Sequence, residues 1–408
     1  MRRVVITGMA GVTALGNNFT DIQAQILGGQ TATKMMPEWS EIEGLQTRLA
    51  APIINFEKPK HYKRKQTRSM GRVALMATRA SEVALEQAGL LNDPQIQDGR
   101  MGIAYGSCSG SSAAVADIAA VHYEKSTHRI TATTYVEMMS HTAAVNVALF
   151  FGLKGRVIPT SSACTSGSQG IGYAYEAIKF GRQELMLAGG AEELCASQSA
   201  VFDTLFATSQ KNEAPASTPR PFDVDRDGLV IGEGATSLVL EEYEHAKARG
   251  ANILAEIVGF ACNSDARHIT QPTAETMQVV INMALEDAQL APESIDYVCA
   301  HGTATELGDI AETTATHNVF SSDMPVSSLK SWYGHTLGAC GALESWLSIE
   351  MMNASWFAHT ANLDNVDERC GQLDFITQAP RHISANYVMN NNFAFGGINT
   401  SLIFKKWV

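Results

Sequence analysis

The chain has seven cysteines and 11 histidines, yet none of them shows the spacing typical of a metal site. No C-x-x-C or H-x-x-x-H pattern occurs, and such short spacings are the usual signature of bound zinc. Paired cysteine spacings typical of a disulfide framework are also absent. We therefore expect no metal ion, no disulfide framework and a reducing compartment, which makes the cytoplasm the expected location.

The sequence also lacks an apolar run of the roughly 20 residues that a membrane-spanning helix needs. Arg2 and Arg3 precede apolar residues 4–6, but Thr7 and Gly8 interrupt the run, which predicts a buried strand and turn rather than a secretory signal. The net charge is -12 and no nucleic-acid-binding motif is present. We expect neither a membrane span nor a nucleic-acid partner.

The 408 residues, 45% of them hydrophobic, exceed one typical domain and contain an internal repeat. Three blocks recur in the same order: 84–90 as 284–290, 102–107 as 297–303, and 236–240 as 400–404. An ordered repeat indicates a duplicated unit, and alternating strands and helices in each copy predict two packed α/β units. We place their boundary near Gly250, without a flexible linker.

One cysteine has a distinctive setting, because Cys164 lies in Ser-Ser-Ala-Cys-Thr-Ser-Gly at residues 161–167. An apolar helical pattern follows over residues 171–178, so we predict a strand that turns into a helix N-terminus at the thiol. There the free N–H groups and the helix dipole favour the thiolate, and the same N–H groups can bind an oxyanion. The alternative is a small buried core thiol. We interpret the other cysteines as buried or incidental: Cys108, Cys195, Cys262, Cys299, Cys340 and Cys370.

Two histidines stand in motifs rich in glycine and threonine: His301 in His-Gly-Thr-Ala-Thr and His335 in Gly-His-Thr-Leu-Gly-Ala. A lone histidine is commonly structural, but the repeated surroundings favour catalysis for both. Cys164 belongs to the first half and the two histidines to the second. We therefore predict an active site where the halves meet.

These motifs, together with Pro-Phe-Asp at 221–223, Arg-Asp-Gly at 226–228, Gly-Glu-Gly at 232–234 and Asn-Phe-Ala-Phe-Gly-Gly at 392–397, give the whole chain a family resemblance. It resembles the elongating type I/II β-ketoacyl-acyl carrier protein synthases, and most of all the ketosynthases of bacterial aryl polyene pathways. The resemblance implies the thiolase fold: an α/β fold whose duplicated halves, residues 1–250 and 251–408, form five αβαβα layers.

The resemblance also implies the chemistry, a decarboxylative Claisen condensation of malonyl-acyl carrier protein with an acyl group held on Cys164. Backbone N–H groups of Cys164 and Phe395 would form the oxyanion hole, and His301 and His335 would donate hydrogen bonds to the enolate. No cofactor is expected, since the substrates travel on the phosphopantetheine arm of the carrier protein. Thr303 and Thr305 resemble the threonines that bind this arm.

Two further sets of residues follow from the same resemblance. A buried polar network would order the site, with the carboxylates as expected partners of the lysine: Lys330, Glu344, Asp309 and Glu312. A second set would form the acyl pocket and its gate: Ser109, Phe202, Phe206, Thr270 and Phe395. Three residues depart from the common pattern, namely Ser109 for a larger aliphatic residue, Phe206 for arginine and Ala394 for glycine. They predict a deeper channel, an altered entrance and a stiffer loop, which suit a conjugated chain.

Seven cations lie between residues 58 and 72 without an acidic residue among them. We predict that Lys63, Arg64, Lys65 and Arg68 dock an acyl carrier protein, because carrier proteins are strongly acidic. The family also implies a two-fold dimer, formed with a second copy or with a related ketosynthase-like subunit.

Three other functions stay open at this point. The first is elongation in primary fatty-acid synthesis. The second is a non-catalytic chain-length partner, which the presence of Cys164 opposes. The third is a degradative thiolase, which the absence of a second cysteine in a C-terminal Cys-x-Gly motif opposes.

Overall fold

The structure, a computed structural model, describes residues 1–408 and is built around an 11-stranded sheet. The order of the strands is β12-β11-β10-β13-β14-β9-β1-β8-β6-β4-β5. The strands of the N-terminal portion are β1 (Val4–Thr13), β4 (Met101–Gly106), β5 (Val157–Thr160), β6 (Leu185–Glu192) and β8 (Gly234–Glu242). Those of the C-terminal portion are β9 (Ala255–Ser264), β10 (Tyr297–Cys299), β11 (Pro325–Ser327), β12 (Asp374–Phe375), β13 (Tyr387–Ala394) and β14 (Ile398–Lys406). A separate small sheet contains β2 (Lys34–Met35), β3 (Leu49–Ala51) and β7 (Ile231–Gly232).

Thirteen α-helices accompany the strands. Their bounds are α1 (Phe19–Leu27), α2 (Arg64–Thr67), α3 (Arg72–Gln87), α4 (Ser112–Glu124), α5 (Thr134–Met138), α6 (Thr142–Phe151), α7 (Ser166–Lys179), α8 (Ala196–Asp203), α9 (Tyr243–Ala248), α10 (Ala274–Ala288), α11 (Glu306–Phe320), α12 (Lys330–Tyr333) and α13 (Cys340–Ala354). None of them combines the length and the apolar composition that a membrane span requires.

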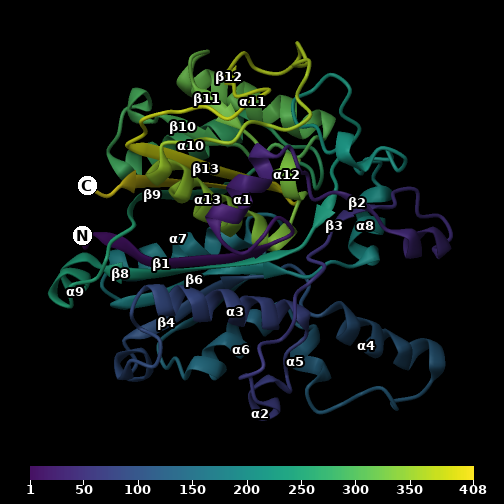
Figure 1. Cartoon of the computed structure of the whole chain (residues 1–408), viewed down its shortest axis with the longest axis vertical. Coiled ribbons are helices and arrows are strands. Elements are labelled where there is room, and N and C mark those ends of the chain that lie inside the picture. The colour runs from purple at the N-terminus through teal and green to yellow at the C-terminus, as the bar shows by residue number, and fades with distance from the viewer.

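The large sheet folds over where β1 meets β9, since these strands pair only through residues 4–6 and 255–257. Figure 1 shows the resulting five layers: α10 and α11, the C-terminal strands, α7 and α13, the N-terminal strands, and α3 with α6. This arrangement confirms the predicted αβαβα thiolase fold. Helices α7 and α13 contact strands of both portions, so they form the central layer.

Two glycines show how similarly the portions are built. A Cβ on Gly8 of β1 would lie 2.1 Å from the carbonyl oxygen of Ala84 on α3, and one on Gly259 of β9 would lie 2.5 Å from that of Ala284 on α10. Only glycine allows a strand to approach a helix this closely. Ala84 and Ala284 are the first residues of the repeated blocks found in the sequence, so the equivalent contacts support a duplication. The boundary near Gly250 stays a prediction.

Candidate active site

Cys164 lies in the turn between β5 and α7, as the sequence predicts. Ala163, which precedes it, adopts the left-handed conformation with φ 50, a costly geometry for a residue with a Cβ. The turn places Cys164 two residues before the first residue of α7, and its side chain is only 5% exposed. The apolar positions after it, Ile171 to Ile178, are buried on α7.

The acidity of this thiol differs from our expectation of a stabilised thiolate. Burial raises the pKa of Cys164 to about 12, while the Lys330 charge and the backbone N–H groups of Cys164 and Phe395 lower it in part. Desolvation of the nearly inaccessible sulfur therefore outweighs the Lys330 charge and the two N–H groups. The resting residue is a thiol, and the two N–H groups that reach its sulfur are the pair expected to form the oxyanion hole.

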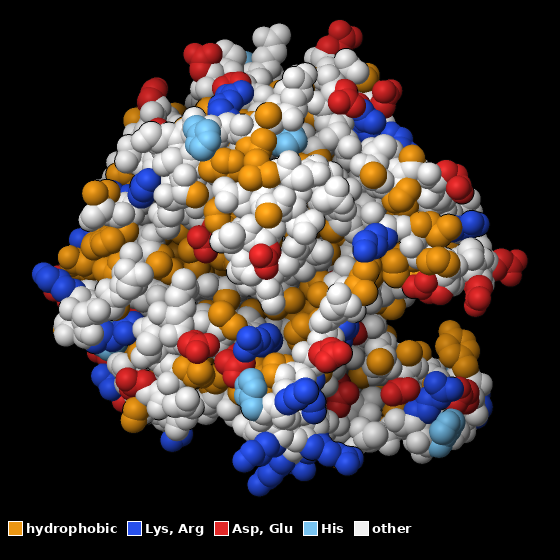
Figure 2. Space-filling view, in the orientation of Figure 1, with side chains coloured by type: hydrophobic (Ala, Val, Ile, Leu, Met, Phe, Trp, Pro, Cys, Tyr) orange, Lys and Arg blue, Asp and Glu red, His pale blue; other side chains and the backbone are white.

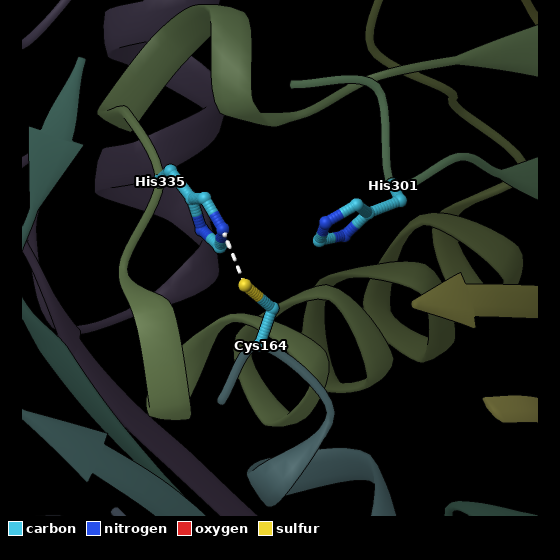
Figure 3. A group of neighbouring side chains, drawn as sticks. All are labelled: Cys164, His301 and His335. Carbon is cyan, nitrogen blue, oxygen red and sulfur yellow. Dashed lines mark hydrogen bonds between the residues drawn. The ribbon is translucent and has the colours of Figure 1, made fainter. Parts of the chain in front are cut away.

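Both histidines face Cys164 (Figure 3). Nε2 of His335 lies 3.0 Å from the Cys164 sulfur, and the rings of His301 and His335 are perpendicular with centroids 5.2 Å apart. Burial together with the Lys330 charge lowers the pKa of each imidazole well below its usual value. Both rings are therefore neutral at pH 7.

The neighbours of each ring decide which nitrogen carries the proton. The backbone N–H of Leu337 donates to Nδ1 of His335 at 3.2 Å, and the Lys330 ammonium, which has no lone pair, donates to Nδ1 of His301 at 3.1 Å. Both Nδ1 atoms are acceptors, so both protons reside on Nε2. The site thus presents two neutral N–H donors in front of the sulfur.

The ligand atoms of Cys164, His301 and His335 also lie within 4.8 Å of one another, close enough to surround a metal ion. A metal at Nε2 would require the lone pair of that nitrogen and would move the proton to Nδ1. In His301 that proton would face the Lys330 ammonium. The tautomers fixed by Lys330 and Leu337 therefore favour hydrogen-bond donation over metal binding.

Lys330 and Glu344 form a fully buried ion pair beneath His301. Burial acts to lower the pKa of Lys330, but the Glu344 carboxylate and nearby thiols outweigh it and hold that pKa above its ordinary value. Lys330 therefore carries its charge. Asp309 and Glu312 do not pair with Lys330, which corrects the expectation that all three carboxylates would.

Asp309 and Glu312 instead hold the loop that carries His301. Glu312 accepts the backbone N–H groups of His301 and Gly302 at 2.6 and 2.7 Å, and Asp309 accepts that of Thr303 at 3.0 Å. Both lie in the first two turns of α11, directly beneath this loop. Burial raises the pKa of Glu312 to about 8 and that of Asp309 to about 6, against the opposing effect of these N–H donors.

A cavity of about 450 Å³ gives access to Cys164, His301 and His335. Several of the predicted binding and gate residues line it as well: Phe202, Phe206, Thr270, Thr303, Thr305 and Phe395. The hydroxyl oxygens of Thr303 and Thr305 lie 2.8 Å apart, and the rings of Phe202 and Phe395 pack with centroids 5.2 Å apart. Phe206 is 88% exposed at the mouth, with a left-handed φ of 55.

The gate residue Phe395 belongs to a tight turn between β13 and β14. Gly396 and Gly397 have φ values of 87 and 71, which glycine adopts without strain. The turn is tied to the loop that carries Thr270, because Gly396 N–H donates to the Ile269 carbonyl and Asp265 N–H donates to the Gly397 carbonyl. Ala394 is the last residue of β13, just before this turn.

Ser109 is the predicted pocket residue that lies apart from this cavity. Its hydroxyl donates to Glu192 at 3.0 Å and accepts from the Gln198 amide at 3.0 Å. Glu192 is buried and also accepts the N–H groups of Cys108 and Gly338. Ser109 therefore hydrogen-bonds to Glu192 and Gln198 instead of lining the cavity. The identity of the residue alone does not predict these partners.

Two residues near Cys164 were not predicted as site residues. The Cys340 thiol donates to the carbonyl oxygen of Cys164 at 3.2 Å, so Cys340 is part of the site and not incidental. Asn392 contacts both Glu344 and His301. Cys340 lies five residues after His335, and Asn392 is the first residue of the motif at 392–397. This closeness to recognised motifs is the feature of the sequence from which a place near the site could have been predicted.

The predicted docking cations are exposed on and beside α2: Lys63, Arg64, Lys65 and Arg68. None of the four has a carboxylate within 4 Å. Arg72 turns inward and pairs with Glu233 at 2.7 Å. Lys and Arg side chains gather at the lower end of Figure 2, where Figure 1 places α2.

The fold is that of the thiolases, and one cysteine and two histidines face one another at its cavity. Two family models match, "Beta-ketoacyl synthase, N-terminal domain" over residues 1–246 and "Beta-ketoacyl synthase, C-terminal domain" over residues 254–364. The chain therefore belongs to the beta-ketoacyl synthase family, a family of acyltransferase-type enzymes.

Known proteins are similar over the full chain. The 3-oxoacyl-[acyl-carrier-protein] synthase 1 of Haemophilus influenzae is 35% identical, with 100% of each chain covered. A crystal structure of a beta-ketoacyl synthase from Burkholderia phymatum is 60% identical with a TM-score of 0.99, again covering 100% of both chains. A type II PKS acyl-carrier protein in complex with its ketosynthase bound to the hexaketide is 30% identical, with a TM-score of 0.87 and 100% of both chains covered.

Proposed function

We propose that the chain condenses a malonyl thioester with an acyl group held on Cys164, releasing carbon dioxide. The observation that carries this is the pair of neutral Nε2–H donors facing the thiol of Cys164. Two such donors suit the oxygen of a thioester enolate, where negative charge develops after decarboxylation.

In the first step the Cys164 sulfur attacks the acyl thioester, the bond from the acyl carbon to the carrier sulfur breaks, and the Cys164 proton is transferred to that sulfur, so that the carrier departs as a thiol. The backbone N–H groups of Cys164 and Phe395 receive the oxyanion, since both point to the sulfur. In the second step a malonyl thioester occupies the cavity and loses carbon dioxide, with its enolate oxygen held by His301 and His335. The enolate carbon then attacks the acyl thioester and frees Cys164.

The substrates would arrive on the phosphopantetheine arm of an acyl carrier protein, with Thr303 and Thr305 binding the arm. Four exposed apolar side chains at the cavity mouth support a protein partner there: Leu205, Phe206, Ile269 and Leu307, exposed by 44, 88, 72 and 56%. The unpaired cations of α2 would attract its acidic surface.

We also propose a dimer, formed with a second copy or with a related ketosynthase-like subunit. Strand β5 is an edge of the large sheet with Val157 44% exposed, and an unpaired edge can add another strand. Helix α4 projects from the body of the molecule (Figure 1), and Ala114 is its only buried residue although it is rich in alanine and valine. Light scattering would give the oligomeric state.

Mass spectrometry of the protein with acyl and malonyl carrier thioesters tests the reaction. In Cys164→Ala we expect no acyl adduct, while Cys164→Gln should still decarboxylate malonyl thioesters, because its amide can occupy the oxyanion hole. Circular dichroism controls for folding. An adduct on another cysteine of Cys164→Ala would contradict the nucleophile, and lost decarboxylation in Cys164→Gln would contradict the oxyanion hole.

For the substrate, we propose unsaturated or aryl-capped chains of an aryl polyene pathway, supported by the exposed aromatic ring of Phe206 at the cavity mouth. Elongation in primary fatty-acid synthesis is the alternative. Extension of matched saturated and polyenoyl carrier thioesters decides between them. We expect the polyenoyl series to be faster in the native enzyme and to lose this advantage in Phe206→Arg, which removes the aromatic ring at the mouth. A preference for the saturated series that Phe206→Arg leaves unaltered would favour primary synthesis.

A further inference from the structure

Asn392 occupies a central position beneath the proposed enolate site. It lies near the end of β13 and is fully buried. Its Nδ2 atom is 2.6 Å from a Glu344 oxygen and 3.4 Å from Nδ1 of His301, and its Oδ1 atom accepts from the Ser168 hydroxyl at 2.9 Å. One amide thus connects α13, the His301 loop and α7.

The amide can make these contacts in one orientation only. Glu344 and Nδ1 of His301 both need a donor, whereas the Ser168 hydroxyl donates, so Nδ2 must face the first pair and Oδ1 the serine. Space is also restricted, since a Cβ on Gly341 would lie 2.6 Å from Oδ1 of Asn392 and 2.4 Å from the Ser168 hydroxyl. The close approach of α13 holds the amide in this place.

Ser168 links the amide to the nucleophile. It follows Cys164 by four residues on α7, and its hydroxyl lies 3.4 Å from the Thr165 carbonyl oxygen at the start of that helix. On the other side, the Asn392 amide and the Lys330 ammonium both donate to Glu344. The same two groups, Asn392 and Lys330, also face Nδ1 of His301. The amide therefore lies between the helix that follows Cys164 and the ring of His301.

We propose that Asn392 is a positioning residue that keeps the proton of His301 on Nε2 and fixes the ring relative to Cys164. This inference rests on the proposed role of His301 in decarboxylation. Without the amide, Glu344 would lose a donor and His301 one of its two Nδ1 partners, so the ring could turn or exchange its tautomer. Acylation of Cys164 uses the backbone oxyanion hole and should be spared.

The first test compares two alanine variants on the same face of β13. Asn390 is also fully buried, but its amide donates at 3.0 Å to Gly341 and Ser345, has only a longer contact of 3.4 Å with Oδ1 of Asn392, and contacts neither histidine. In Asn392→Ala we expect malonyl decarboxylation to fall about 10- to 100-fold, the range seen when residues behind a catalytic ligand are removed. Acyl loading of Cys164 in that variant, and both half-reactions in Asn390→Ala, should change by less than about threefold.

The second test reads the state of His301 directly. Asn392→Asp replaces the donor with an oxygen of the same shape, and a carboxylate beside Nδ1 would raise the pKa of His301. Nitrogen NMR of labelled histidine should report the proton on Nε2 in the native enzyme and a mixture in the variant. The acid limb of decarboxylation should move to higher pH.

Equal losses of loading and decarboxylation in Asn392→Ala, or decarboxylation within about threefold of native, would overturn the inference. His301→Ala serves as the reference. If His301→Ala loses decarboxylation selectively and Asn392→Ala does not, only the role of Asn392 fails. If His301→Ala decarboxylates normally, the proposed function fails instead.

Discussion

The two histidines that face Cys164 are held by different parts of the chain. His335 is fixed by the backbone: Leu337 N–H donates to its ring, and its own peptide pairs with Val230 and Gly232. His301 is fixed by side chains, because Lys330 and Asn392 donate to its ring. Substitutions can therefore disturb His301 without touching His335, and this difference allows the two proposed donors to be tested separately.

Breaking the ion pair beneath His301 should have the largest effect. Lys330→Met leaves Glu344 as an uncompensated buried charge, which should lower the free energy of unfolding by about 3–5 kcal/mol. Lys330→Met combined with Glu344→Gln removes both charges and should recover much of that stability while decarboxylation stays slow. Urea unfolding measures the first quantity and carbon dioxide release the second. Full recovery of decarboxylation in the double variant would contradict the dependence of His301 on Lys330.

Removing either ring should have the next largest effect. His301→Ala and His335→Ala each delete one donor to the enolate oxygen, and loss of such a donor typically costs about 10²- to 10³-fold in rate. Decarboxylation should fall by this factor in both variants, with a smaller loss of acyl loading. Separate assays of loading and carbon dioxide release provide the measurement. Equal loss of the two half-reactions would count against the enolate role.

The sequence predicts the place of this site better than its hydrogen bonding. The two α/β units and the turn at Cys164 follow from the repeated blocks and the helical spacing after residue 164, and the five-layer arrangement follows from the family resemblance. The partners of Lys330 do not follow from local patterns, because Glu344, Asp309 and Glu312 all carry a carboxylate that could pair with a lysine. Only their positions on α13 and α11 decide that Glu344 binds the lysine while the other two hold a backbone loop.

Charge reversal on α2 should have a moderate effect confined to carrier-bound substrates. Glutamate at Lys63, Arg64 and Lys65 should raise KM for acyl carrier thioesters about tenfold and flatten its salt dependence, because complementary charge mainly accelerates encounter. Short pantetheine thioesters should react as before. Lys247→Glu on α9, far from α2 in Figure 1, is the matched control. Equal losses with both kinds of substrate would indicate misfolding.

The smallest expected effect concerns pH, where the two histidines should behave alike. Each is buried near the Lys330 charge with a pKa well below its usual value, so the neutral form is kept at lower pH than in an ordinary histidine and is lost only as pH falls through this lowered pKa. A histidine of ordinary pKa, about 6.5, would lose about fourfold of its neutral form between pH 8 and pH 6. Decarboxylation should instead stay nearly constant between these values.

Two carboxyls of the His301 loop can titrate in or beside the same interval, since burial raises the pKa of Glu312 to about 8 and that of Asp309 to about 6. Glu312 holds the loop through two N–H groups and Asp309 through the N–H of Thr303. The ionised Glu312 carboxylate accepts the N–H groups of His301 and Gly302 better than the neutral acid does, and its population increases as pH rises. A rate that increases toward pH 8 in the native enzyme but not in Glu312→Gln therefore belongs to Glu312. A fourfold acid loss that persists both in Glu312→Gln and in Asp309→Asn would mean that a catalytic imidazole titrates near 6.5, and would contradict the neutral pair of donors.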